Sequence, residues 1–187
     1  AAFVITGLGK RISYILIGKL GNTTLGLGYV TAILDLLIAP ATPSNTARAG
    51  GIVFPIINSV SVALGSDPNE SPRKAGHYLM VNVYMVTKTT SYMFLTAMAP
   101  NALALEMMSK ILNIQISWAG WALAAAVPGL VMLALTPYII YKMYPPELKK
   151  VDNKKIAVEG QKALGPMTLR EKLLCVIFCL ALLGWVG

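Results

Sequence analysis

Long apolar blocks separated by short polar segments make up most of this chain. The main blocks cover residues 25–38, 52–64, 78–98 and 118–141. The last two reach the roughly 20 residues that a membrane-spanning helix needs, whereas the first two fall short of that length. Because a single segment can satisfy its own backbone groups in lipid only as a helix, the pattern predicts an all-α polytopic membrane protein.

A polar tip separates the two short blocks. Ser44, Asn45 and Thr46 form its centre, with Pro43 before them and Gly50 after them. Non-helical backbone is tolerated at membrane depth only where protein or a water-filled cavity covers it. We therefore expect residues 23–64 to form a re-entrant helical hairpin whose Ser-Asn-Thr tip faces a polar cavity. Two spanning helices would also leave both ends of this segment on the same side of the membrane. The expectation of a re-entrant hairpin therefore depends on the short apolar lengths of the two arms.

The next apolar segment predicts a discontinuous transmembrane helix over residues 78–112. A polar stripe that includes Lys88 lies inside its first part, and Ala99, Pro100 and Asn101 interrupt the apolar pattern. Proline frees backbone groups, and the ends of broken helices are where transporters hold ions and substrates. We expect the second half-helix to begin at Asn101.

The remaining segments complete the division of the chain. Lysine and arginine are concentrated between residues 142 and 172, which marks that segment as cytoplasmic. Thr168 and Glu171 have the spacing of a capping box, which predicts a helix start. We expect an interfacial amphipathic helix over 1–20, a cytoplasmic loop over 65–77, a transmembrane helix over 117–143, a basic cytoplasmic linker over 144–168 and the start of the next transmembrane helix over 169–187.

Composition and charge exclude several classes of protein. The chain is 56% hydrophobic and 13% charged, with a mean hydropathy of +0.64, which is too apolar for a soluble domain of 187 residues. Its net charge of +8 lies in short loops beside apolar blocks, so it suits orientation and anionic lipid rather than nucleic acid. Cys175 and Cys179 have no further thiol with which to complete a metal site, so we interpret them as packing residues.

The ends of the chain suggest a piece of a longer protein. It begins without methionine and closes inside an apolar block.

Ser44-Asn45-Thr46 at a hairpin tip, followed by a helix broken at Pro100-Asn101, resembles the divalent anion/sodium symporter family. The string over residues 39–52 is more similar to its citrate/succinate and tartrate/succinate antiporter branch, which includes 2-oxoglutarate/malate translocators. The resemblance covers nearly the whole chain. It implies an inverted-repeat secondary transporter of the bacterial inner membrane that forms a homodimer. This chain would supply the first-repeat hairpin through to the start of the second repeat, without the second Ser-Asn-Thr tip.

The resemblance also implies which residues form the site. Hydroxyls, an amide and helix N-termini can hold a dicarboxylate without a permanent charge that would trap it. In the sodium-coupled pattern a small residue stands where this chain has Arg48, so a fixed cation could replace sodium. The expected substrate-binding residues are Ser44, Asn45, Thr46, Pro100 and Asn101, and the expected cation site or fixed-charge substitute comprises Arg48, Lys88 and Ala99.

Several functions remain open at this stage. The resemblance favours exchange of di- or tricarboxylates (citrate, succinate, tartrate, malate or 2-oxoglutarate) by alternating access, without a cofactor. The closest alternative is a symporter of the same fold that would use Na⁺. An intramembrane enzyme is disfavoured because no spacing of acids, metal ligands or nucleophiles suggests a catalytic set.

Each polar feature also has a structural alternative. Ser44 to Thr46 could form an ordinary turn, Arg48 could pair with Asp35, and Lys88 could be an ion-pair partner. A purely structural subunit, however, gives no reason for a lysine and a polar tip inside the bilayer.

Overall fold

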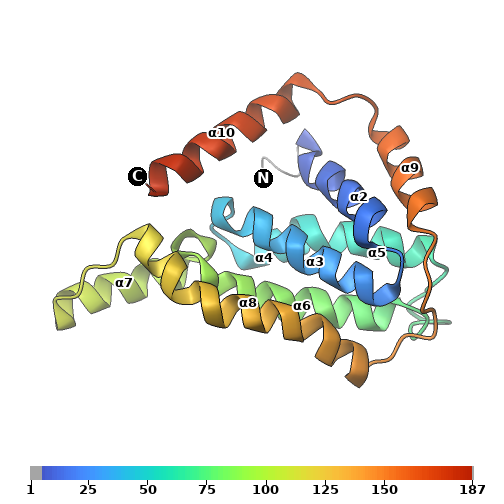
Figure 1. Cartoon of the computed structure of the whole chain (residues 1–187), viewed down its shortest axis with the longest axis horizontal. Coiled ribbons are helices and arrows are strands. Elements are labelled where there is room, and N and C mark those ends of the chain that lie inside the picture. The colour runs from blue at the N-terminus through green and yellow to red at the C-terminus, as the bar shows by residue number, and fades with distance from the viewer. Residues whose placement is uncertain (1–5, 187) are drawn as a thin grey trace.

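Helices carry the whole fold of the computed structural model, which describes residues 6–186 (Figure 1). The predicted all-α class is therefore confirmed. Residues 1–5 and 187, which belong to the predicted first and last segments, lie outside the described residues. The helices are α2 (Leu8–Leu20), α3 (Thr24–Ile38), α4 (Asn45–Arg48), α5 (Phe54–Ala63), α6 (Gly76–Met93), α7 (Ala99–Leu112), α8 (Trp118–Met143), α9 (Asn153–Leu164) and α10 (Leu169–Val186).

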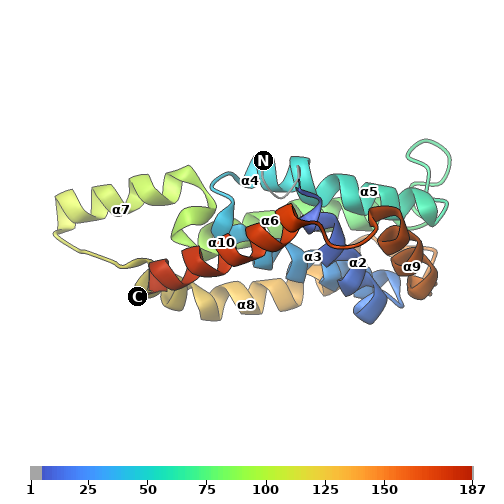
Figure 2. The ribbon, with the colours of Figure 1, turned by 90° about the horizontal axis from the view of Figure 1, so that it is seen from above.

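The centre of the molecule is a bundle of α3, α5, α6 and α8. Helix α6 packs against the other three, and α7 projects from one end of the bundle while α9 lies at the other (Figures 1 and 2). Buried apolar side chains from α3, α5 and α6 form much of the core. This core includes Leu27, Val30, Leu34, Ile57, Val60, Leu79 and Val83.

The two hairpin arms are longer than the apolar pattern indicated. A 3₁₀ turn, η1 (Ala39–Ala41), extends the first arm, and a π-helical segment, η2 (Ala49–Val53), joins α4 to α5. Helical structure therefore continues through Pro40 and Gly50, which we expected to lie outside the arms. The expectation that the arms are too short to span a bilayer is wrong, because their helical lengths are 18 and 19 residues, so arm length does not distinguish a re-entrant hairpin from two spanning helices.

Three helical stretches of the described residues are long and apolar enough to cross a membrane. They are Thr24–Ala41, Asn45–Ala63 and Trp118–Met143, judged by length and composition alone. Helix α8 continues through both Pro128 and Pro137. Helix α6 does not meet the same criterion, which is consistent with the polar stripe along its second half.

The helix interruption lies earlier than expected. Helix α6 ends at Met93, a short 3₁₀ turn, η3 (Leu95–Ala97), follows, and α7 begins at Ala99 rather than Asn101. Pro100 thus occupies the first turn of α7, where its missing N–H has no intrahelical partner to lose. The proline starts the second half-helix instead of breaking the chain.

The segment expected to be a basic linker contains α9. Asp152 caps this helix by accepting a hydrogen bond from the Lys155 N–H at 3.2 Å. The high lysine content obscured its apolar positions. After α9, the predicted capping box is confirmed, since the Thr168 N–H donates to Glu171 and the Glu171 N–H donates to the Thr168 hydroxyl.

Candidate functional site

The hairpin tip is a short, partly exposed turn that opens into a helix. Ser44 is the N-cap of α4, and its hydroxyl accepts a hydrogen bond from the Ala47 N–H at 3.2 Å. The Asn45 side-chain oxygen accepts the Thr46 N–H at 2.8 Å. These contacts stabilise the turn through side-chain acceptors, and the Thr46 side chain remains exposed.

A pocket of about 210 Å³ lies between the tip and α6. The hairpin contributes Asn45 and Thr46 to its lining, and α6 contributes Tyr84, Thr87 and Lys88. The Lys88 ammonium lies 5.0 Å from the centre of the Tyr84 ring, a cation–π contact between residues one helical turn apart. The structure thus brings two predicted tip residues together with the predicted cation Lys88.

Arg48 lies behind this pocket, in the interior of the protein, where its side chain has no exposed surface. Its Nε donates to Asp35 at 3.1 Å, and Asp35 is equally buried. The remaining N–H groups donate to the Thr42 carbonyl, the Ala97 carbonyl and the hydroxyls of Thr90 and Ser91, at 3.0 to 3.3 Å. All five guanidinium donors therefore have oxygen partners.

This arrangement changes the expected role of Arg48. The structure shows the ion pair with Asp35 that the sequence left as an alternative, so Arg48 is not an uncompensated charge. Its hydrogen bonds join the first arm, the tip, α6 and the interruption. Asp35 gains a second contact, because the Thr90 hydroxyl also donates to it. Arg48 is thus a cross-link between four segments.

The interruption contributes less to the tip pocket than expected. Asn101 is buried, and its amide donates to the carbonyls of Ser91 and Phe94 at 2.8 and 2.9 Å. Ala99 and Pro100 are exposed at the start of α7. These three residues shape the break and do not line the pocket at the tip.

Sequence reasoning missed Tyr84, Thr90 and Ser91 as members of this region. Helical periodicity could have found them within the polar stripe. Residues 84, 87 and 88 line the pocket. Thr90 and Ser91 lie within one turn of them and accept hydrogen bonds from Arg48. The stripe therefore contributes both to the lining of the pocket and to the hydrogen bonds of Arg48.

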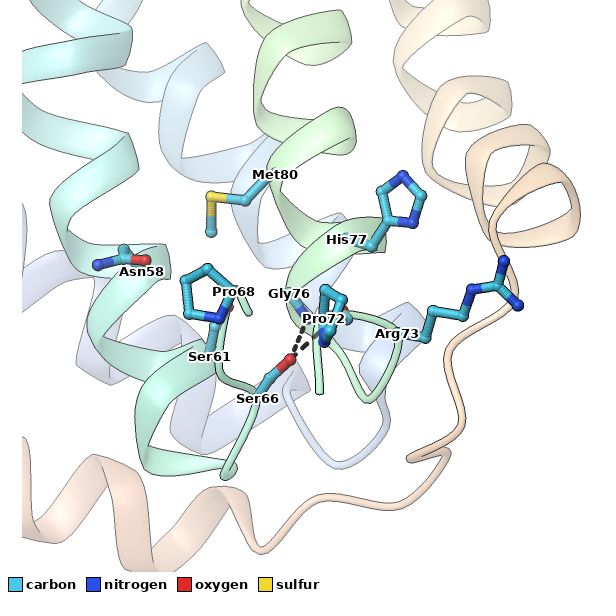
Figure 3. Close-up of a pocket in the computed structure, with 9 residues that line it drawn as sticks. All are labelled: Asn58, Ser61, Ser66, Pro68, Pro72, Arg73, Gly76, His77 and Met80. Atoms are coloured by element: carbon cyan, nitrogen blue, oxygen red, sulfur yellow. Dashed lines mark hydrogen bonds between the residues drawn. The ribbon is translucent and has the colours of Figure 1, made fainter. Parts of the chain in front are cut away.

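A second pocket, of about 380 Å³, lies at the opposite end of the hairpin, where α5 meets α6 (Figure 3). Ser66 organises this end, since its hydroxyl accepts the Gly76 N–H at 2.9 Å. Figure 3 shows the Arg73 side chain extending away from Ser66. None of the predicted site residues lines this pocket, so we assign the candidate site to the tip.

Comparison with known proteins gives a consistent result. The family model described as "Sodium:sulfate symporter transmembrane region" matches residues 1–187. Inner membrane protein YbhI of Escherichia coli (strain K12) is 72% identical over 186 residues. The putative malate transporter YflS of Bacillus subtilis is 48% identical and the citrate/succinate antiporter of Escherichia coli is 42% identical over the same length. These matches cover 98% to 100% of this chain but only 38% or 39% of each relative.

Proposed function

Because this chain belongs to the sodium:sulfate symporter family of membrane transporters, we propose that the full-length protein exchanges di- or tricarboxylates across the bacterial inner membrane. The observation that carries the proposal is the pocket that joins Asn45 and Thr46 to Lys88. The names of two relatives, a putative malate transporter and a citrate/succinate antiporter, support this substrate class.

The chemistry of the pocket suits one carboxylate group of a substrate. The Lys88 ammonium can form a charge-assisted hydrogen bond with it, and the Asn45 amide and Thr46 hydroxyl can donate to the same group. A second carboxylate needs further donors. The chain spans about two fifths of its relatives' length, so we propose that the remaining chain supplies them.

The charge balance favours exchange over sodium-coupled uptake. Arg48 already donates to carbonyl, hydroxyl and carboxylate oxygens, which are the kinds of ligand that a sodium ion would need. Asp35 compensates Arg48, so Lys88 is the positive charge that faces the pocket. An empty site would keep this charge unpaired, and reorientation through lipid would be disfavoured until an anion binds. The alternative is a sodium-coupled symporter of the same fold.

We further propose that the hairpin is re-entrant, because its tip is hydrogen-bonded to the break between α6 and α7, and that the hairpin and the break move together during alternating access. Contacts at the tip support movement as one unit. Arg48 binds the Ala97 carbonyl, and the Thr96 hydroxyl donates to the Pro40 carbonyl at 2.7 Å. Both contacts connect the hairpin to the break between α6 and α7.

Cysteine labelling in cells tests the depth of the tip. A membrane-impermeant maleimide should label Asn22→Cys and Asp67→Cys only after the cells are permeabilised, because both residues are exposed at the base of the hairpin, on the expected cytoplasmic side. Ala47→Cys, at the tip, should react slowly from the periplasm compared with Gln115→Cys, which follows α7 on the expected periplasmic side. Equal periplasmic rates for Ala47→Cys and Gln115→Cys would show that the arms span the bilayer.

Substrate exchange by the full-length protein in proteoliposomes tests the proposed site. Asn45→Ala and Thr46→Ala should each lower the affinity for succinate or citrate about tenfold or more, since a hydrogen bond to a charged group contributes about 1.5–3 kcal/mol. Asn69→Ala, an exposed loop asparagine, is the matched control and should leave exchange unchanged. Normal affinity in both tip variants would support the alternative that Ser44 to Thr46 form only a turn.

A further inference from the structure

Helices α2 and α9 pack closely enough to act as one rigid surface. A Cβ atom at Gly18 would lie 3.1 Å from the Ala157 methyl group, and the Tyr14 ring occupies the space that a side chain at Gly160 would need. The Asn153 amide donates to the carbonyls of Ile17 and Gly18 at 3.1 and 2.8 Å, so it caps the end of α2. The glycines allow this close approach, and the amide sets the register of the two helices.

The segment before α9 is held in place as well. The Val151 N–H donates to the Asn22 carbonyl at 3.0 Å, and the Thr24 N–H donates to the Lys149 carbonyl at 3.2 Å. Residues 148–151 therefore lie along the base of the hairpin. We call α2, residues 148–151 and α9 together the α2–α9 surface.

Exposed lysines dominate the α2–α9 surface. None of them has a carboxylate within ion-pair distance among residues 6–186. Glu171 is engaged by Arg11 at 2.8 Å, and Asp152 caps α9, so two nearby acids are already occupied. The lysines are Lys10, Lys19, Lys149, Lys150, Lys154, Lys155 and Lys162.

Apolar side chains are exposed among these lysines. On α9, Lys154, Val158 and Lys162 follow one another at four-residue spacing, and Val158 is 50% exposed. On α2, Ile15 is 42% exposed and lies four residues before Lys19. Lysine beside exposed aliphatic side chains is the composition of a helix that lies at the headgroup level of a membrane.

We propose that the α2–α9 surface binds the headgroups of anionic phospholipids. The lysines would contact the phosphates, while Ile15 and Val158 would insert below them. Helix α9 lies at the loop end of the bundle, and α2 extends from it across the bundle (Figures 1 and 2). This binding is separate from substrate exchange, because none of its residues lines the tip pocket.

Lipid selectivity of the full-length protein tests the proposal. In proteoliposomes, spin-labelled phosphatidylglycerol should associate with the protein more strongly than spin-labelled phosphatidylcholine, and salt should weaken this preference. In the triple variant Lys154→Gln/Lys155→Gln/Lys162→Gln, the affinity for phosphatidylglycerol relative to phosphatidylcholine should fall at low salt. The expected fall is roughly fivefold for each lysine removed.

The matched control removes three exposed basic residues elsewhere, in the variant Arg73→Gln/Lys110→Gln/Lys142→Gln. It should retain the wild-type selectivity. An equal loss in both triple variants would mean that only the total charge matters, and no loss in the α9 variant would overturn the proposal. Substrate exchange, measured on the same samples, should not change in the α9 variant. Folding of each variant is checked by size-exclusion chromatography.

Discussion

An Arg48→Met variant of the full-length protein is expected to be less stable than the wild type by about 3–5 kcal/mol, because it leaves Asp35 charged and buried without its partner. The double variant Asp35→Leu/Arg48→Met should recover much of this loss, since replacing both ions removes the unpaired charge. Denaturant unfolding in detergent micelles, analysed as a double-mutant cycle, measures the coupling between the two residues.

Arg73→Met is the matched control for Arg48→Met. Arg73 is exposed, so its removal should change stability by less than about 0.5 kcal/mol. If Arg48→Met and Arg73→Met unfold alike, the cross-link between the hairpin and the interruption does not stabilise the protein.

Exchange by the wild-type protein is expected to proceed without sodium, and Lys88→Gln is expected to weaken substrate affinity about tenfold or more. The reason is that Lys88 supplies the positive charge at the tip pocket, while Arg48 already donates hydrogen bonds to the nearby carbonyl oxygens of Thr42 and Ala97. Counterflow in proteoliposomes, with sodium or with choline, measures both effects. Lys88→Arg should keep part of the activity because it keeps the charge.

Lys110→Gln is the control for Lys88→Gln, since Lys110 pairs with Glu106 on the exposed surface of α7. It should leave exchange unaltered. Strict dependence of wild-type counterflow on sodium would contradict the proposed exchange mechanism and support the sodium-coupled symporter alternative. Normal affinity in Lys88→Gln would instead show that the pocket at the tip does not bind the substrate.

The order of apolar and polar residues was sufficient to predict the all-helical class and the positions of helices such as α8 and α10. Helix α8 follows its apolar block closely and runs through Pro128 and Pro137, as expected for a buried or lipid-facing helix. The capping box at Thr168 and Glu171 was also predictable, because both partners lie within one turn. Such features depend on neighbours in the sequence, and the amino-acid order contains them directly.

Local signals failed where packing outweighed them. Pro40 and Gly50 suggested the ends of the arms, yet the 3₁₀ turn η1 includes Pro40 and the π-helical segment η2 includes Gly50. The lysines around α9 suggested a linker, although Ala157 and Gly160 pack against α2 and stabilise a helix there. Propensity is a weak preference, and contacts with another helix override it.

The candidate site could likewise be predicted only in part from the sequence. The polar pattern and the family resemblance singled out Asn45, Thr46 and Lys88, but only the tertiary structure placed them around one pocket. It also decided that Arg48 faces Asp35, 13 residues earlier, and Ser91, 43 residues later. The physical reason is that helical periodicity determines which residues share a face, whereas the partner of that face depends on how the helices pack.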